Sequence, residues 1–135
     1  MGSECKQLAM VTLDDIRQAR DLLQGIAVRT PLLEWLGPSA AANGRRLFLK
    51  PEKLQPFGAF KLRGAYNKIA SLPAEERRRG VISYSSGNHA QGVAYAARAL
   101  GVRAVIVMPN NAPTIKRDAT AAMGAEIVIV GPGQR

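Results

Sequence analysis

The order of apolar and polar positions predicts helices and strands along most of the chain. A first helix is expected from Thr12, whose hydroxyl can cap a helix, to Gly25, with apolar side chains at helical spacing: Ile16, Ala19, Leu22 and Leu23. Residues 27–32 read as extended, because the residue before their proline avoids the helical region. Residues 37–44 are small and rich in turn formers, which predicts a surface loop, and residues 46–50 read as a short strand.

The second half of the chain has a more regular pattern. Glycines and prolines separate apolar, β-branched runs from segments with helical spacing, which predicts helices over 60–72, 89–100 and 113–123 and strands over 81–84, 102–108 and 126–130. This alternation predicts the α/β class, with a parallel sheet and helices on both faces. In such a sheet the carboxyl ends of the strands share one edge, where ligands bind.

Composition narrows the class of protein. With 135 residues, 47% apolar, and no apolar run near the roughly 18 residues that a membrane span needs, we expect a soluble globular chain. Residues 1–10 lack the pattern of a secretory signal. Cys5 is the only cysteine and His89 the only histidine, so no disulfide framework and no cysteine or histidine metal site is expected, and a cytoplasmic location is predicted.

The formal net charge of +9 raises nucleic-acid binding as a hypothesis. The basic residues are mostly scattered singly, and the one run, residues 77–79, follows two glutamates as the end of a solvated helix would. Aromatic residues make up only 5% of the chain and form no stacking series. We therefore expect neither a nucleic-acid partner nor a membrane partner.

Lys61 is the first candidate for chemistry. It follows a turn that contains Gly58, and Phe60 and Leu62 place apolar side chains on either side of it. Apolar surroundings disfavour an ammonium, so the pKa of Lys61 is expected to fall and its amine to react with carbonyl groups. From these residues alone, an ordinary surface lysine whose amine reaches water stays an open alternative.

The stretch from Ser83 to His89 lies between the end of a predicted strand and the start of a helix. Free backbone N–H groups at a helix start, together with the hydroxyls of Ser85 and Ser86, can bind a small carboxylate. Asn88 can cap the helix or donate its amide to a ligand oxygen. The same residues also make an ordinary helix cap, and the stretch alone does not decide between the two.

Together these motifs resemble the threonine and serine dehydratase group of the fold type II pyridoxal-phosphate enzymes. The resemblance rests on residues 50–55 running into 58–65, on Ser85-Ser86-Gly87-Asn88-His89-Ala90-Gln91-Gly92, and on Met108-Pro109 with Ala112-Pro113 and Lys116. It also includes Thr30-Pro31-Leu32 and covers the chain from about Thr12 onward.

The resemblance implies a role for each matching residue. Lys61 matches the lysine that carries pyridoxal 5'-phosphate on its amine and later moves the substrate's α-proton. Phe60 matches the residue beside the cofactor ring, and Asn88 the asparagine that bonds the ring hydroxyl oxygen. Ser86 matches the serine on the opposite side of the cofactor in the racemases of this group. The substrate loop corresponds to Ser85, Ser86, Gly87, Asn88 and His89.

The implied reaction is the loss of the β-hydroxyl from a small amino acid such as threonine or serine, giving a 2-oxo acid and ammonia. Ala59 stands where the family usually has serine, as in hydroxyaspartate dehydratases, so hydroxyaspartate dehydration and amino acid racemisation stay open.

The resemblance also implies parts that this sequence lacks. The family's glycine-rich phosphate loop and the residue against the pyridine nitrogen lie far beyond residue 135. The chain is therefore expected to be an amino-terminal portion: residues 1–72 from the large cofactor domain and residues 73–135 from the small domain. Alone, the chain is expected to bind the cofactor weakly and to have no catalytic activity. The alternative is a non-catalytic remnant of such an enzyme. The full-length protein is expected to form a homo-oligomer.

Overall fold

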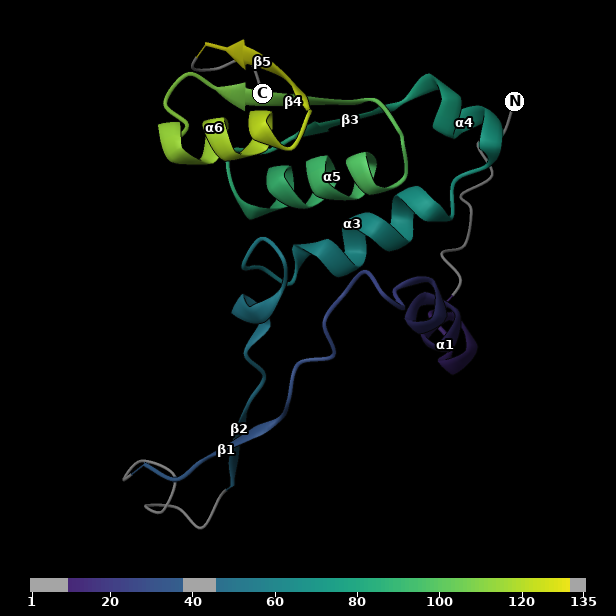
Figure 1. Ribbon diagram of the computed structural model, residues 1–135, viewed down its shortest axis with the longest axis vertical. Coiled ribbons are helices and arrows are strands. Elements are labelled where there is room, and N and C mark those ends of the chain that lie inside the picture. Colours follow the sequence, from purple (N-terminus) through teal and green to yellow (C-terminus); the bar gives the residue numbers. More distant parts are fainter. Residues whose placement is uncertain (1–9, 38–45, 132–135) are drawn as a thin grey trace, which may run out of the picture.

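A computed structural model of the chain describes residues 10–37 and 46–131 (Figure 1). Cys5, most of the predicted loop over 37–44 and residues 132–135 lie outside the described residues. The first predicted helix is confirmed as α1 (Leu13–Leu22). Its start is fixed by a capping box, in which Thr12 Oγ1 accepts from the backbone N–H of Asp15 at 3.2 Å and the Asp15 carboxylate accepts from the N–H of Thr12 at 2.8 Å.

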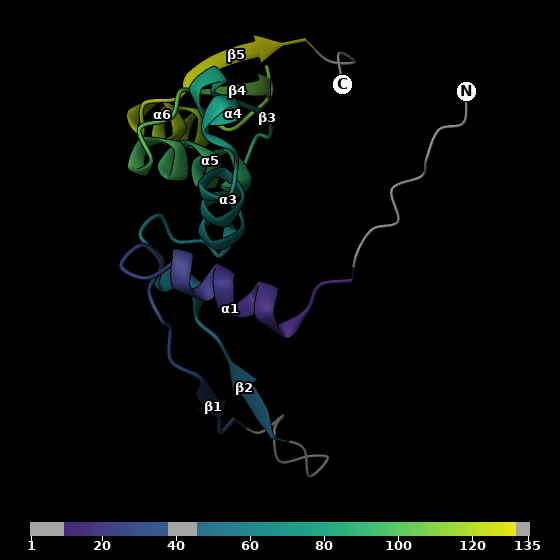
Figure 2. The same cartoon turned by 90° about the vertical axis from the view of Figure 1, so that its right-hand side faces the viewer.

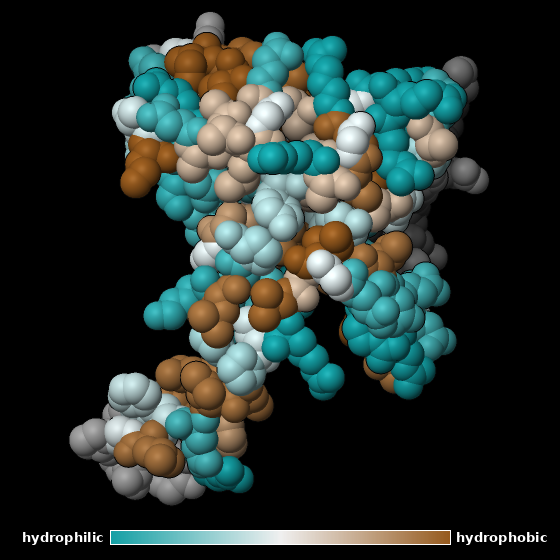
Figure 3. Space-filling model, in the orientation of Figure 1, coloured by the Kyte–Doolittle hydropathy of each residue, from teal (hydrophilic) through white to brown (hydrophobic). Residues whose placement is uncertain are grey.

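A two-stranded hairpin extends away from the rest of the molecule (Figures 1 and 2). The predicted strand over 46–50 is confirmed as β2 (Leu47–Leu49), and it pairs antiparallel with β1 (Leu33–Trp35), which the sequence did not predict. All six residues of the two strands are exposed. Figure 3 shows hydrophobic side chains gathered on this ribbon.

The second half contains the predicted alternation of helices and strands. After the short 3-10 helix η1 (Glu52–Leu54) come these elements: α3 (Lys61–Ala70), α4 (Ala74–Arg79), β3 (Val81–Tyr84), α5 (Asn88–Ala99), β4 (Ala104–Pro109), α6 (Thr114–Ala122) and β5 (Glu126–Val130). The three strands form a parallel sheet in the order β3-β4-β5. The predicted α/β class with a parallel sheet and helices is confirmed, while α4 is a separate helix where the sequence indicated only a helix end.

The helices of this half form layers on one side of the sheet (Figures 1 and 2). α5 and α6 lie against the sheet, and α3 packs on the outer side of α5. Side chains of strand β4 alternate between the two faces of the sheet, and those on the helix side are buried in the core with α5: Ala104, Ile106 and Met108. The opposite face exposes Ile82 and Tyr84, so the second helical layer expected from the sequence is not among the described residues.

The main cluster of buried apolar residues runs from Ala65 of α3 to Ala125 before β5, and Ala59 and Leu62 are buried just before it. Many of its members are alanines of α5, which let α3 and the sheet approach that helix closely. Gly80 has a φ of +86°, and a Cβ there would lie 2.8 Å from the carbonyl oxygen of Arg103, so only glycine fits at the start of β3. No helix in the described part of the chain has the length and apolar character needed to cross a membrane.

Candidate active site

Lys61 is the first residue of α3 and follows a tight turn. Gly58 has a φ of +79° and donates its N–H to the carbonyl of Gln55 at 2.7 Å, as the sequence indicated for this glycine. Of the two apolar side chains expected beside the Lys61 amine, only that of Phe60 lies near it. The ammonium of Lys61 lies 5.0 Å from the centre of the Phe60 ring, but Leu62 is fully buried in the core, and Lys61 and Phe60 are both exposed.

The loop after β3 turns directly into α5. Ser85 donates its backbone N–H to the carbonyl of Val107 at 3.0 Å, which ties the loop to strand β4. Its Oγ accepts from the backbone N–H groups of Gly87 and Ala90, both at 3.3 Å. Ser85 therefore acts as a cap for the start of α5, which is the ordinary role that the sequence left open.

Several other groups of this loop have no hydrogen-bond partner among the described residues. In the described part of the chain, no hydrogen bond engages the backbone N–H groups of Ser86, Asn88 and His89 or the hydroxyl of Ser86. A Cβ placed on Gly87 would meet no atom within 4 Å, so the space above this backbone is open. Free donors around open space at the start of a 12-residue helix are an arrangement that can accept a small anion, and we call residues 85–89 the anion loop.

The lysine and the loop are brought to neighbouring positions by the packing of α3 on α5. Gly92 lies one turn after Asn88, and a Cβ there would lie 3.1 Å from the carbonyl oxygen and 3.2 Å from the Cβ of Lys61. The backbone of Lys61 therefore touches α5 within one turn of the anion loop. Two stretches that are more than 20 residues apart in the sequence are thus brought close together, while their joint role as one site stays a prediction.

His89 lines a hollow of about 270 Å³ between α3 and β3, together with Lys68 and Ser83. This hollow is mostly walled by apolar side chains of those two elements and Val93 of α5. The role of His89 toward a substrate carboxylate stays a prediction.

A polar cluster fixes the chain on both sides of Lys61. Arg63 forms a two-point ion pair with Glu52, at 2.8 and 2.9 Å, and Thr30 donates its hydroxyl to the same carboxylate at 2.6 Å. Gln55 is buried and exchanges hydrogen bonds with the N–H and carbonyl of Val28 at 2.9 and 2.8 Å. The Arg63 guanidinium, together with the Thr30 hydroxyl and the Gln55 amide, lowers the pKa of Glu52 to about 2.

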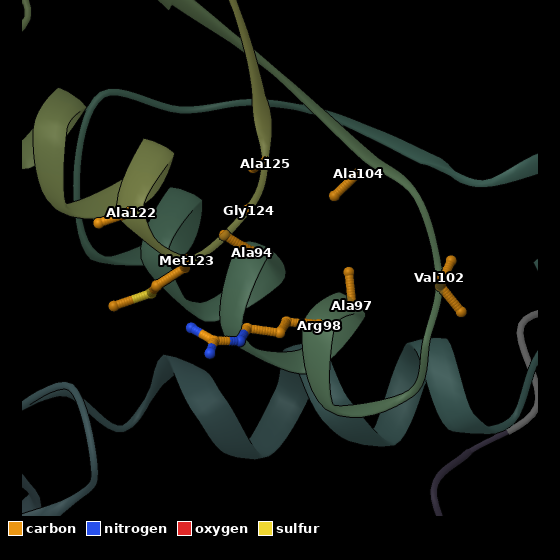
Figure 4. A pocket seen from close by; sticks show the side chains of 9 residues that line it. All are labelled: Ala94, Ala97, Arg98, Val102, Ala104, Ala122, Met123, Gly124 and Ala125. Atoms are coloured by element: carbon orange, nitrogen blue, oxygen red, sulfur yellow. The ribbon is translucent and has the colours of Figure 1, made fainter.

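A second hollow lies away from this site (Figure 4). It has a volume of about 270 Å³ and lies between α5, α6 and the sheet, near the amino end of β4. Arg98 is its only charged lining residue; the others are Ala94, Ala97, Val102, Ala104, Ala122, Met123, Gly124 and Ala125. Because the anion loop lies at the carboxyl edge of the sheet, this hollow is not part of the candidate active site.

Known proteins are similar to most of this chain. The family of pyridoxal-phosphate-dependent enzymes matches residues 23–135. The chain belongs to this family. It is 48% identical over 122 residues to the L-threonine ammonia-lyase of Thermotoga maritima, covering 90% of this chain and 30% of that protein.

Two further members of the family are similar to this chain. A catabolic L-threonine dehydratase of Staphylococcus aureus is 43% identical over 122 residues, which is 90% of this chain and 35% of that protein. The crystal structure of serine racemase from Dictyostelium discoideum superposes with a TM-score of 0.85 at 37% identity, covering 93% of this chain and 41% of that one. The chain thus spans about a third of the length of the curated relatives that it matches.

Two features of the described residues fit the family's cofactor. Lys61 is exposed, so a carbonyl group of a ligand can reach its side-chain nitrogen. The open space above Gly87 would be filled by any side chain at that position, so this backbone is clear for an approaching ligand.

Two side-chain contacts near the candidate site residues were not predicted from the sequence. Lys116 donates its Nζ to Asn88 Oδ1 at 2.7 Å, across 28 positions of the chain, and Glu52 gathers the cluster beside Lys61. Both residues lie in the motifs that carry the resemblance, but only the fold shows which atoms they meet.

Proposed function

We propose that this chain supplies the reactive lysine and the substrate-carboxylate loop of a pyridoxal-phosphate-dependent ammonia-lyase. The substrate would be a small β-hydroxy amino acid such as threonine or serine, and the products a 2-oxo acid and ammonia. The observation that carries the proposal is the open backbone at Gly87, next to the free N–H groups of Ser86, Asn88 and His89, on a helix that contacts Lys61 at Gly92. The identity to an L-threonine ammonia-lyase supports the choice of reaction.

Each residue of the candidate site would have a role that follows from its side-chain or backbone chemistry. Lys61 would hold the cofactor through Nζ and then, as a free amine, accept the α-proton of the substrate. The backbone N–H groups of the loop would bind the substrate carboxylate, and Asn88 would donate to an oxygen of the cofactor ring. When bound, pyridoxal phosphate supplies an electron sink for the α-carbon. Loss of the β-hydroxyl as water leaves an enamine, which hydrolyses to the oxo acid and ammonia.

Racemisation is the second candidate, and one observation favours it. The Ser86 hydroxyl is without a hydrogen-bond partner in the described residues, so it is available to move a proton on the other side of the substrate. The structural neighbour with a TM-score of 0.85 is a serine racemase. Ala59 keeps hydroxyaspartate among the possible substrates, and a non-catalytic remnant remains the alternative to any enzyme.

We further propose that residues 1–72 belong to a large cofactor domain and residues 73–135 to a small domain. The parallel sheet and helices α5 and α6 are formed entirely by residues after 73, which supports this division, and Ala65 and Ile69 of α3 pack against α5 across the proposed boundary. A cytoplasmic location and homo-oligomerisation of the complete protein are part of the same proposal.

The attachment of the cofactor tests the central step. The purified chain is mixed with substoichiometric pyridoxal phosphate and reduced with borohydride, and the labelled peptide is identified by mass spectrometry. We expect the label at Lys61, with weak binding and no turnover by the chain alone. Lys61→Ala should abolish that label, while Lys68→Ala, on the same helix, should keep it. A label spread over surface lysines would contradict the proposal.

The reaction is tested on the protein expressed from the complete reading frame that contains this sequence. It is assayed with threonine, serine and hydroxyaspartate. Release of a 2-oxo acid supports the lyase, formation of the opposite enantiomer supports the racemase, and the absence of both supports the remnant.

A further inference from the structure

Lys116 forms a link between α6 and the first turn of α5. Its Nζ lies 2.7 Å from Asn88 Oδ1 and 3.5 Å from Gln91 Oε1. Gln91 is buried and Lys116 is half-buried, so the ammonium sits at the junction of the two helices. In the described residues Lys116 has no carboxylate partner, which leaves amide oxygens as the acceptors of its donors.

The backbone of Lys116 is itself fixed. Thr120 is fully buried and donates its hydroxyl to the carbonyl of Lys116 at 2.7 Å. The ammonium is therefore delivered to Asn88 from a rigid part of the core and does not come from a loose surface residue.

This contact decides which way the Asn88 amide faces. A lysine ammonium only donates hydrogen bonds, so it must meet the amide oxygen, since the amide NH₂ would be repelled. The Nδ2 group then faces away from Lys116, and within residues 10–37 and 46–131 no hydrogen bond engages its two N–H donors. The positive charge behind the amide oxygen also polarises the amide and strengthens those donors.

We propose that Lys116 is a positioning residue that makes Asn88 a hydrogen-bond donor toward the cofactor's ring oxygen. The inference rests on the proposed function, because the acceptor is an oxygen of pyridoxal phosphate. Without Lys116 the Asn88 amide can rotate and present either its oxygen or its NH₂ to the ligand.

The first test needs no cofactor. Side-chain amide resonances of Asn88 are recorded by NMR in the chain and in Lys116→Met, which keeps most of the side-chain length but lacks the charge. We expect these resonances to shift in Lys116→Met, and to stay unchanged in the matched control Arg117→Met, which removes a charge from the neighbouring position of α6. Unchanged Asn88 resonances in Lys116→Met would overturn the positioning role, whatever the chain binds.

The second test measures the apparent dissociation constant of pyridoxal phosphate by absorbance titration. Loss of one oriented hydrogen bond should raise it roughly five- to tenfold in Lys116→Met. Arg117→Met should bind as the unchanged chain does, and Lys116→Arg, which keeps a charged donor, should retain most of the affinity. In an Asn88→Ala background, Lys116→Met should have no further effect. The inference would be overturned if Lys116→Met weakened cofactor binding as much in the Asn88→Ala background as in the unchanged chain. It would also be overturned if Arg117→Met weakened binding as much as Lys116→Met. In either case the lysine would act through its charge alone.

Failure of the proposed function gives a different result. If the unchanged chain binds no pyridoxal phosphate and labels no lysine, both the function and the role of Asn88 toward the cofactor are overturned. A shifted Asn88 amide in Lys116→Met would then show only the helix–helix contact.

Discussion

Two glycines inside helices have opposite surroundings, and they test how tightly Lys61 is held. Gly64 in α3 has open space where a Cβ would be, whereas a Cβ at Gly92 in α5 would press on the Lys61 backbone at 3.1 Å. Neither has a positive φ, so alanine meets no backbone strain at either position. The difference between the two positions is therefore a matter of packing alone.

Gly64→Ala should stabilise the chain by roughly 0.5–1 kcal/mol, because alanine loses less backbone entropy in a helix. In Gly92→Ala, the steric contact of the new Cβ with Lys61 should cancel this stabilisation. Gly92→Val should destabilise the chain by about 1–3 kcal/mol. Free energies of unfolding from urea titration measure the differences. Equal effects of alanine at both positions would show that α3 and α5 are not in close contact at Lys61.

At the scale of elements, the polar cluster around Glu52 joins the extended segment before β1 to the start of α3. Arg63 and the other partners hold the pKa of Glu52 at about 2, below its ordinary value of 4.5. The ionised carboxylate is thus favoured in the folded chain, and this stabilisation is fully present above the unfolded pKa. It is lost as the pH falls from about 4.5 toward 2.

Glu52→Gln should therefore destabilise the chain at neutral pH, by up to roughly 3 kcal/mol from the difference between the two pKa values. Its stability should also fall less steeply than that of the unchanged chain between pH 4.5 and 2. The matched control is Glu126→Gln, whose exposed ion pair with Arg103 spans 3.5 Å and should contribute less than ~1 kcal/mol. Thermal unfolding at several pH values measures both. The same pH profile in Glu52→Gln and in the unchanged chain would contradict this account of the cluster.

The sequence predicted those elements whose signals are local. The strands and helices after residue 80 follow from β-branched runs, helical spacing and glycine punctuation, and all of them are present. Strand β1 was missed because Leu33–Trp35 is too short for a periodic pattern and pairs with residues 12 to 16 positions later. For the candidate site, the motifs that contain Lys61 and the loop could be recognised in the sequence, but the Lys116 contact depends on side-chain geometry that no spacing rule specifies.

At the scale of the whole molecule, the chain has an apolar core at one end and an apolar hairpin in solvent at the other. Trp35 is the only tryptophan of the sequence and lies on this hairpin with 45% of its surface exposed. Its neighbours Leu33, Phe48 and Leu49 are also exposed. An apolar ribbon of this kind favours association with another surface.

The fluorescence of Trp35 therefore reports on the hairpin alone. At low concentration we expect the emission of a solvent-exposed indole, readily quenched by acrylamide. As the concentration rises, the emission should shift to the blue and sedimentation should show larger species, because the ribbon buries its apolar surface between chains. A blue-shifted, protected emission at the lowest concentration would mean that the hairpin is covered within a single chain.

The cluster at Glu52 also has a consequence for which sequences this fold tolerates. At position 28 it uses only the backbone: the N–H donates to Gln55, and the carbonyl accepts from Gln55 and Arg63. The valine side chain is exposed and makes none of these bonds. Most residue types should therefore be tolerated at position 28, except proline, which has no backbone N–H to donate. Substitutions of Glu52, Gln55 and Arg63 should instead depend on one another, because these side chains share hydrogen bonds.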